Sequence, residues 1–304
     1  MGITHGWLLS QHHDVSWLVR GDRADFYGEP FELRVHDLRP GRRDTTATVS
    51  LKLVTSIAPD LYDAVLVMVP GGSLPDVLPV LDGAGTRVPV VLMLNHWNLA
   101  GALGGSSEPR ANRLLGFPSQ IGGGRQDHRI SVTVFPRGTV LEAGTASKKA
   151  ALDKAEALLA SGGLTIRRQR RMPDWLAVHS MQQALTAAPL IEAGSYRAFA
   201  ADREAIARMV VAFREGLDVC RARGIRTWRL WPAPLFTFPK PLVARLLQGM
   251  FQRAETEAMG HMGHGLDEWI EGLESIRADA QRLGVPAPEI DRQWAVIRSR
   301  HSGA

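Results

Sequence analysis

The sequence has almost no cysteine: Cys220 is the only one among 304 residues. A disulfide within the chain is therefore excluded, and such low cysteine usage is typical of proteins in a reducing compartment. The amino-terminal stretch also lacks the charged region and the small-residue cleavage site of a secretory signal. We therefore predict a cytoplasmic protein.

Long hydrophobic runs are missing as well, since no apolar stretch approaches the about 20 residues that span a bilayer. No membrane partner is expected. Charged residues make up 22% and hydrophobic residues 45%, as in soluble globular proteins rather than disordered chains. The net charge of +5 comes mainly from scattered arginines, with one dense run at 167–171. So short a run is a weak signal, and no nucleic-acid partner is expected.

Up to about residue 170, the sequence alternates between patterns typical of strands and of helices. The runs 63–70 and 88–94 are nearly all apolar, as expected for strands buried on both faces of a sheet. The predicted strands cover 14–20, 31–38, 48–54, 63–70, 88–94 and 164–170, and the predicted helices cover 73–81 and 147–163.

Two predictions in this half concern turns and helix ends. The segment 129–144 predicts either a hairpin or two extended segments around a glycine turn. The helix over 147–163 is expected to have Ser147 as its N-cap and Gly162 just past its end.

From residue 171 onward the spacing of apolar residues is helical. The fold class that follows is an α/β domain over residues 1–170 and an all-helical domain over residues 171–304. The predicted helices of the second domain cover 173–193, 200–223, 240–259, 266–283 and 287–299.

The amino-terminal segment suggests a nucleotide site. Gly2 opens an amphipathic helix, and the strand that follows ends at Arg20, with Arg23 close by. In a Rossmann unit the first helix N-terminus holds the pyrophosphate, and an arginine at the end of the second strand accommodates the 2′-phosphate of NADP. We predict NADP(H) as the cofactor; the alternative is that Gly2 is incidental and Arg20 is a surface charge.

Several motifs together resemble the ketopantoate reductase (2-dehydropantoate 2-reductase) family. They are GITHGWLL (2–9), HDV (13–15), LVR (18–20), YDAVLVMV (62–69), VLMLN (91–95), GTVLEAG (138–144) and RLGVPAP (282–288). The resemblance implies a Rossmann domain followed by a helical domain like that of 6-phosphogluconate dehydrogenase. It also implies that Asn95 lies near the nicotinamide, and that Pro70 stands where the family has a strand-end lysine.

The same resemblance implies that the first Rossmann strand is absent from this sequence. In the strand order 3-2-1-4-5-6 that strand is central. The strands expected at 14–20 and 63–70 would therefore lose their common neighbour. We hypothesise that the natural start lies upstream of Met1.

The catalytic motif departs from the family pattern K-L-x-x-N. Trp175 stands where the resemblance places the proton-donating lysine, and His179 stands where it places the asparagine. An indole cannot donate a proton to an alkoxide, whereas an imidazole is well suited to proton transfer near neutral pH. We predict His179 as the catalytic group; the alternative is a hydrogen-bonded histidine in the domain interface. The family's later glutamate has no clean counterpart near 266–268.

A second group of histidines lies in AETEAMGHMGHG (254–265). We predict that His261 and His264 contact the substrate in a glycine-containing turn. Two alternatives stay open: a metal site that includes Glu257, and a plain helix junction. No metal is expected, because the order His-Glu-x-x-His is absent.

Two functions are consistent with these features. The first is an NADP(H)-dependent oxidoreductase that transfers hydride to a small 2-oxo acid or related carbonyl compound, with the usual lysine replaced. The second is a catalytically inactive relative that acts as a binding protein. A small-molecule substrate and a possible homodimer are the expected partners, with Trp228 and Trp231 in the core or in the dimer interface.

Overall fold

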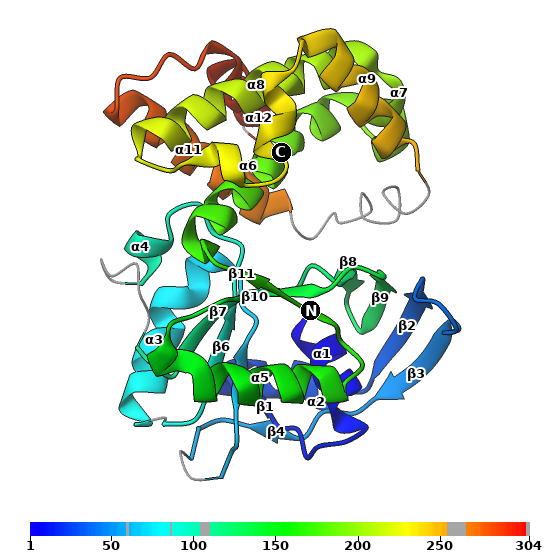
Figure 1. Ribbon diagram of the computed structural model, residues 1–304. Helices are drawn as coiled ribbons and strands as arrows, with labels where there is room; N and C mark the ends of the chain where they lie inside the picture. Colours follow the sequence, from blue (N-terminus) through cyan, green and yellow to red (C-terminus); the bar gives the residue numbers. More distant parts are fainter. Residues whose placement is uncertain (59–60, 86, 104–109, 254–265, 302–304) are drawn as a thin grey trace. The chain divides into compact units, whose positions relative to one another are not determined.

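The computed structural model describes residues 1–58, 61–85, 87–103, 110–253 and 266–301 (Figure 1). The chain divides into two compact units. The α/β unit comprises Met1–Leu94 and Ala100–Met172, and the helical unit comprises Asn95–Leu99 and Pro173–Ala304. The short segment Asn95–Leu99 therefore belongs with the helices, although β-strands precede and follow it in the sequence.

The main sheet of the α/β unit has the strand order β11-β10-β7-β6-β5. Its central strands are buried along their whole length, which explains their apolar sequences. All neighbouring pairs are parallel except β10 with β7. The strands are β5 (Val65–Val67), β6 (Val90–Met93), β7 (Arg113–Phe117), β10 (Thr139–Glu142) and β11 (Ile166–Gln169).

Two short strands, β1 (Trp17–Leu18) and β4 (Leu53–Val54), form a separate parallel pair. Within the described part of the chain, β1 pairs only with β4, and β5 pairs only with β6. The expectation that these two strands lack a common neighbour is therefore confirmed. The helix α1 (Gly2–Ser10) precedes β1.

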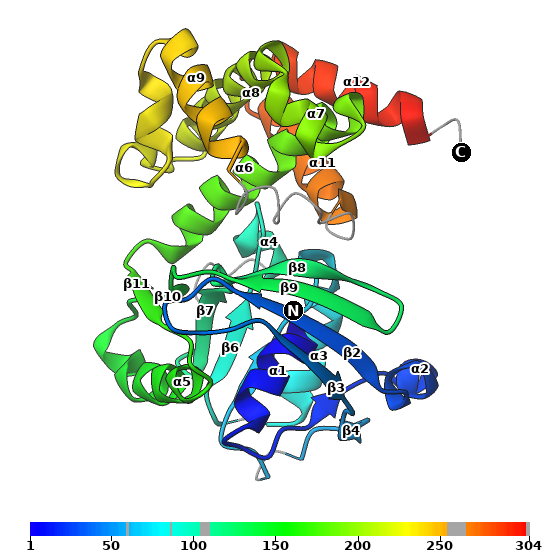
Figure 2. The same cartoon turned by 90° about the vertical axis from the view of Figure 1, so that its right-hand side faces the viewer.

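A second sheet of the α/β unit has the order β3-β2-β9-β8 (Figure 2). Its strands are β2 (Phe31–Asp37), β3 (Thr45–Val49), β8 (Ile121–Gln126) and β9 (Arg129–Val134). The single strand predicted over 48–54 is wrong, because β3 and β4 belong to different sheets. The hairpin alternative for 129–144 is also wrong: β9 and β10 pair in different sheets, so the alternative of two extended segments holds.

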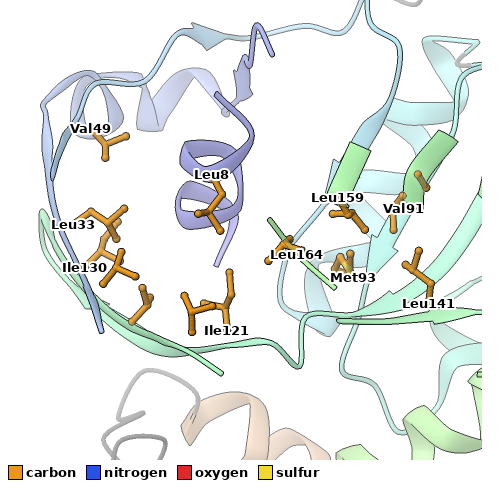
Figure 3. Packing of buried hydrophobic residues seen from close by; sticks show 14 of the residues in the cluster. Leu8, Leu33, Val49, Val91, Met93, Ile121, Ile130, Leu141, Leu159 and Leu164 are labelled. Carbon is orange, nitrogen blue, oxygen red and sulfur yellow. The ribbon is translucent and has the colours of Figure 1, made fainter. Parts of the chain in front are cut away.

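Helix α1 lies between these sheets in the core of the α/β unit. Leu8 points into a cluster of buried side chains that come from both sheets and from α5 (Lys149–Ser161), as Figure 3 shows. Among them are Leu33, Ile130, Met93, Leu141 and Leu159. Burial of this apolar surface is the main term that stabilises the unit.

The start of α5 differs from the prediction. Ser147 lies inside the 3-10 turn η3 (Ala146–Lys148), so it is not the N-cap; Gly162 is the C-cap, as predicted. Lys148 is buried, and its Nζ lies 3.1 Å from both carboxylate oxygens of Glu142. Glu142 Oε1 also accepts a hydrogen bond from the backbone N–H of Leu115 in β7, at 2.8 Å. This buried ion pair therefore links β7, β10 and the turn before α5.

The helical unit follows the predicted segments closely. The segment 200–223 is split, because Asp202 caps α8 by accepting hydrogen bonds from the N–H groups of Glu204 and Ala205. The helices are α6 (Met172–Ala193), α7 (Tyr196–Ala201), α8 (Arg203–Ala222), α9 (Lys240–Phe251), α11 (Leu266–Arg282) and α12 (Pro288–His301). Among the described residues, we find no helix with the length and apolar character needed to cross a bilayer.

The remaining elements are the ten-residue helix α3 and several short helical segments. They are η1 (Gly21–Arg23), α2 (Ala24–Gly28), η2 (Gly71–Ser73), α3 (Leu74–Gly83), α4 (Leu99–Ala102), η4 (Thr227–Arg229) and η5 (Ala233–Thr237).

Candidate functional site

The segment Asn95–Leu99 is anchored to the helical unit through Trp97, which is 3% exposed. Its indole N–H donates to Asp279 Oδ2 at 2.8 Å. The guanidinium of Arg223 lies 4.3 Å from the centre of the indole ring, and its Nη1 donates to the Trp97 carbonyl oxygen at 3.1 Å. These contacts hold the backbone on which Asn95 is carried.

Asn95 lies at the centre of a polar cluster with Gln183 of α6 and Glu268 of α11. Asn95 Nδ2 donates to Gln183 Oε1 at 2.6 Å, and its side chain also hydrogen-bonds Glu268. Asn95 Oδ1 is buried and accepts no hydrogen bond from the described residues. A buried acceptor of this kind is costly unless a donor reaches it, so it marks a place where a ligand N–H or O–H would be favourable.

The surroundings of the Glu268 carboxyl group favour its protonated form near neutral pH. Burial raises the pKa of Glu268 from 4.5 to about 7. The hydrogen bond from Asn95 lowers the pKa, and the nearby Glu271 carboxylate raises it. A carboxyl group with a pKa near 7 can act as acid or base at physiological pH.

Sequence reasoning missed Glu268 and Gln183 as site residues. The only signal for Glu268 was its position near the expected late glutamate. Gln183 comes one helical turn after His179, so the two share a side of α6. The structure thereby brings Asn95 to the side of α6 on which His179 lies.

His179 is partly buried, and Trp175 covers one face of its ring. The two rings are stacked, with centroids 4.9 Å apart and planes 11° apart, and Trp175 is 6% exposed. The residue that replaces the expected lysine therefore packs against the predicted catalytic histidine.

Of the residues predicted to bind the cofactor, Asn95 belongs to the helical unit, and the other four belong to the α/β unit. Gly2 is the first residue of α1, and an added Cβ there would lie 3.7 Å from Met68 Cβ. Met68 is two residues before Pro70, the N-cap of η2, so Gly2 and Pro70 lie in the same region. Arg20 directly follows the β1 region, and its side chain is 76% exposed.

The Arg20 guanidinium has a long contact with Asp22, at 4.0 Å. Arg23 is exposed, and its backbone N–H donates to the Arg20 carbonyl at 2.9 Å. The exposed side chains of Arg20 and Arg23 therefore both follow β1, where they could bind an anionic group.

His261, His264 and Glu257 lie outside the described residues, so their predicted roles stay predictions. Within the described ranges, no cluster of three or more histidine, cysteine or acidic side chains is arranged to hold a metal ion.

Comparison with known proteins identifies the fold. No protein-family model matches the chain. No curated protein matches it either. The solved structure of D-mandelate dehydrogenase with NADH and anilino(oxo)acetate matches with a TM-score of 0.70 and 15% identity, covering 100% of this chain and 96% of that one.

Two ketopantoate reductases match almost as well. The dimeric enzyme from Staphylococcus aureus has a TM-score of 0.60 and 14% identity, with coverage of 99% and 96%. The enzyme from Geobacter metallireducens has a TM-score of 0.64 and 14% identity, with coverage of 98% and 96%. The predicted fold class, a Rossmann-type α/β unit followed by a helical unit, is confirmed; identities this low identify the fold alone.

Proposed function

We propose that this chain is a nicotinamide-dependent oxidoreductase that interconverts a small 2-oxo acid and its 2-hydroxy acid, with NADP(H) as the preferred cofactor. The observation that carries the proposal is the Glu268 carboxyl group, with its near-neutral pKa, held against Asn95. The fold shared with D-mandelate dehydrogenase and the ketopantoate reductases supports the choice of reaction.

The residues present suit such a cofactor. The orphaned Asn95 Oδ1 can accept a hydrogen bond from a carboxamide N–H. Arg20 and Arg23 can pair with a 2′-phosphate, and the first turn of α1 at Gly2, with the turn at Pro70, can face the pyrophosphate. When bound, the nicotinamide supplies or accepts the hydride.

The chain's own contribution is to move a proton and hold the substrate. As the substrate carbonyl oxygen gains charge, Glu268 donates its proton to that oxygen, and the resulting carboxylate regains a proton from water. Asn95 and Gln183 orient Glu268 through their linked amides. His179 is the competing proton donor, because it lies on the same side of α6 as Gln183.

The inactive alternative has one specific observation in its favour, the buried Trp175 in place of the family lysine. Two measurements distinguish an inactive relative from an active oxidoreductase. Cofactor binding is followed by the fluorescence of NADPH and NADH, and turnover is followed by their oxidation with a panel of 2-oxo acids. Binding without turnover on any acid supports the inactive relative, and saturable turnover supports the enzyme.

Arg20→Glu is expected to raise the Kd for NADPH by about 10- to 100-fold and to change the Kd for NADH much less, because a charge-assisted hydrogen bond contributes about 1.5–3 kcal/mol. Titration of both cofactors checks this. Arg43→Glu, at another exposed arginine of the same unit, is the matched control. An equal loss of affinity for both cofactors would contradict the NADP preference.

A homodimer is proposed through the helical unit. Among the described residues of this unit, five large apolar side chains are exposed, so the core interpretation of the two tryptophans is wrong. These side chains lie on or beside η4, η5 and α9, and η5 contacts both of the other two elements. Exposed apolar side chains that gather on one surface mark association sites. The side chains are Trp228, Trp231, Phe238, Leu242 and Leu246, which are 62%, 69%, 53%, 48% and 52% exposed.

The double variant Leu242→Glu/Leu246→Glu is expected to convert a dimer into a monomer. The two positions are one turn apart on α9, so the charges would fall on one stripe. Light scattering over a range of concentrations measures the mass. Leu61→Glu, at a leucine that is 76% exposed in the other unit, should leave the mass unchanged. A monomeric parent chain at every concentration would refute the proposal.

A further inference from the structure

Gly272 lies in the interior of α11, where a glycine is unfavourable for the helix. A glycine kept at such a position commonly serves a close packing contact. A Cβ added at Gly272 would lie 3.1 Å from Ala184 Cβ and 3.9 Å from Ser180 Oγ, both on α6. Carbon atoms in ordinary contact are about 3.5–4.0 Å apart. The glycine therefore allows α11 to approach α6 more closely than any other residue would.

The candidate site lies beside this contact. Glu268 and Gly272 are four residues apart, so they share a face of α11. On α6, Gln183 directly precedes Ala184, and its Oε1 accepts the hydrogen bond from Asn95. The Asn95 side chain in turn hydrogen-bonds Glu268. The close approach of the two helices and the polar cluster therefore lie within one helical turn of each other.

Helix α6 is also held from another side, because α8 packs closely against it. A Cβ added at Gly216 of α8 would lie 2.5 Å from Met181 Sδ and 3.1 Å from Leu185 Cδ1. Met181 and Leu185 are fully buried, and each directly follows one of the α6 residues that face Gly272. A side chain added at position 272 is therefore accommodated by a movement of α11.

Helix α11 is anchored on the far side of Gly272 from Glu268. Asp279 accepts a hydrogen bond from the Trp97 indole at 2.8 Å and pairs with Arg223 at 3.5 Å. At a rise of about 1.5 Å per residue, Asp279 lies about 10 Å from Gly272 and about 16 Å from Glu268 along the helix. If α11 pivots at Asp279, its displacement at Glu268 is about one and a half times that at Gly272.

We propose that Gly272 and Ala184 are positioning residues, whose contact sets the spacing of α11 and α6 and thereby holds the Glu268 carboxyl group against Asn95. The expected effect on turnover rests on the proposed function, in which Glu268 donates the proton. The expected effect on the carboxyl group itself does not. Separation of the two helices admits water to the carboxyl group and weakens its hydrogen bond with the Asn95 amide.

These changes act on the pKa of Glu268 in opposite directions. Burial is the largest cause and raises the pKa, so access of water lowers it; loss of the Asn95 hydrogen bond raises it by less. The Glu271 carboxylate, which also raises the pKa, lies on α11 and moves with Glu268. On α6, the neighbouring Gln183 is neutral, and His179 is one turn away from it. The net result expected from separation is a lower pKa.

The test uses the full chain with Gly272→Leu, Gly272→Ala and a matched control, Gly249→Leu. Gly249 lies in the interior of α9, where an added Cβ would meet nothing within 4 Å. The pKa of Glu268 is measured by NMR titration of the glutamate side-chain carboxyl carbons, and its signal is assigned by its loss in Glu268→Gln. Neither cofactor nor substrate is needed for this measurement.

Gly272→Leu is expected to lower the pKa of Glu268 by about one unit or more, and Gly272→Ala by a smaller amount. Gly249→Leu should leave it unchanged. Adding Ala184→Gly to Gly272→Ala should restore the parent value, because it removes the atom that the new Cβ meets. In the same variants, the step in the pH profile of kcat/KM should move to lower pH by the same amount.

An unchanged pKa in Gly272→Leu overturns the proposal. A lowered pKa in Gly272→Ala that Ala184→Gly does not restore also overturns it. If Gly272→Leu does not fold, the Gly272→Ala variant and its double variant decide between these outcomes. A shifted and restored pKa in chains that turn over no 2-oxo acid would support the positioning role and contradict the proposed function alone.

Discussion

Glu268→Gln is expected to lower kcat/KM for 2-oxo acid reduction by about 10²- to 10³-fold, the range that a positioned general acid contributes. Glutamine keeps the size of the side chain and can still hydrogen-bond Asn95, but its amide has no acidic proton to transfer. In the parent chain, the rate of reduction should fall as pH rises through about 7, because the Glu268 carboxyl group loses the proton that it must donate. Oxidation of the hydroxy acid should quicken over the same range, since it needs the carboxylate.

The pH profile of kcat/KM checks this prediction, because the variant should lose the step near pH 7 in both directions. Asp267→Asn, at the exposed neighbouring position on α11, is the matched control and should leave the profile unchanged. A Glu268→Gln chain that retains the parent rate and profile would remove Glu268 from the mechanism. If His179→Gln then abolished turnover, the proton donor would be His179.

The raised pKa of Glu268 also makes the stability of the folded chain depend on pH, and this dependence can be measured without an activity assay. The folded state binds this proton more tightly than the unfolded state, whose pKa is about 4.5. The stability contributed by the group is therefore complete below about pH 4.5 and is lost as pH rises through about 7. Thermal unfolding of the parent chain and of Glu268→Gln across this range distinguishes a titrating Glu268 from a loss of structure.

Lys148→Met is expected to lower the free energy of unfolding by about 3–5 kcal/mol, because it leaves the buried Glu142 carboxylate without its cation. Adding Glu142→Gln to that variant should recover most of the loss. The amide keeps an acceptor for the Leu115 N–H and carries no charge. Urea denaturation of the parent chain, both single variants and the double variant measures the coupling.

Lys149→Met is the matched control for that experiment. Lys149 is the next residue, and it pairs with Asp153 on the exposed surface of α5. An exposed pair contributes about 0–1 kcal/mol, so the loss should be small. If Lys148→Met and Lys149→Met lowered the free energy of unfolding equally, the buried pair would contribute no more to stability than the exposed pair.

Much of the fold follows from local sequence patterns. The apolar run that forms β6 and the helical spacing that forms α6, α8 and α12 indicate their elements directly, because burial depends on the same periodicity. The second sheet was not predicted. Its strand β2 pairs with β9, nearly a hundred residues later, and β8 contains three glycines in a row, which favour a turn over a strand.

Part of the candidate site could likewise be predicted from the sequence, and part could not. Sequence reasoning by itself determined the fold class, the departure at Trp175, and Asn95 and His179 as candidates, because these depend on residue type and order along the chain. Only the tertiary structure decided that Gln183 and Glu268 lie against Asn95 and that one carboxyl group is buried enough to hold a proton near pH 7. Burial and hydrogen bonding between distant segments set that pKa, and neither quantity exists until the chain has folded.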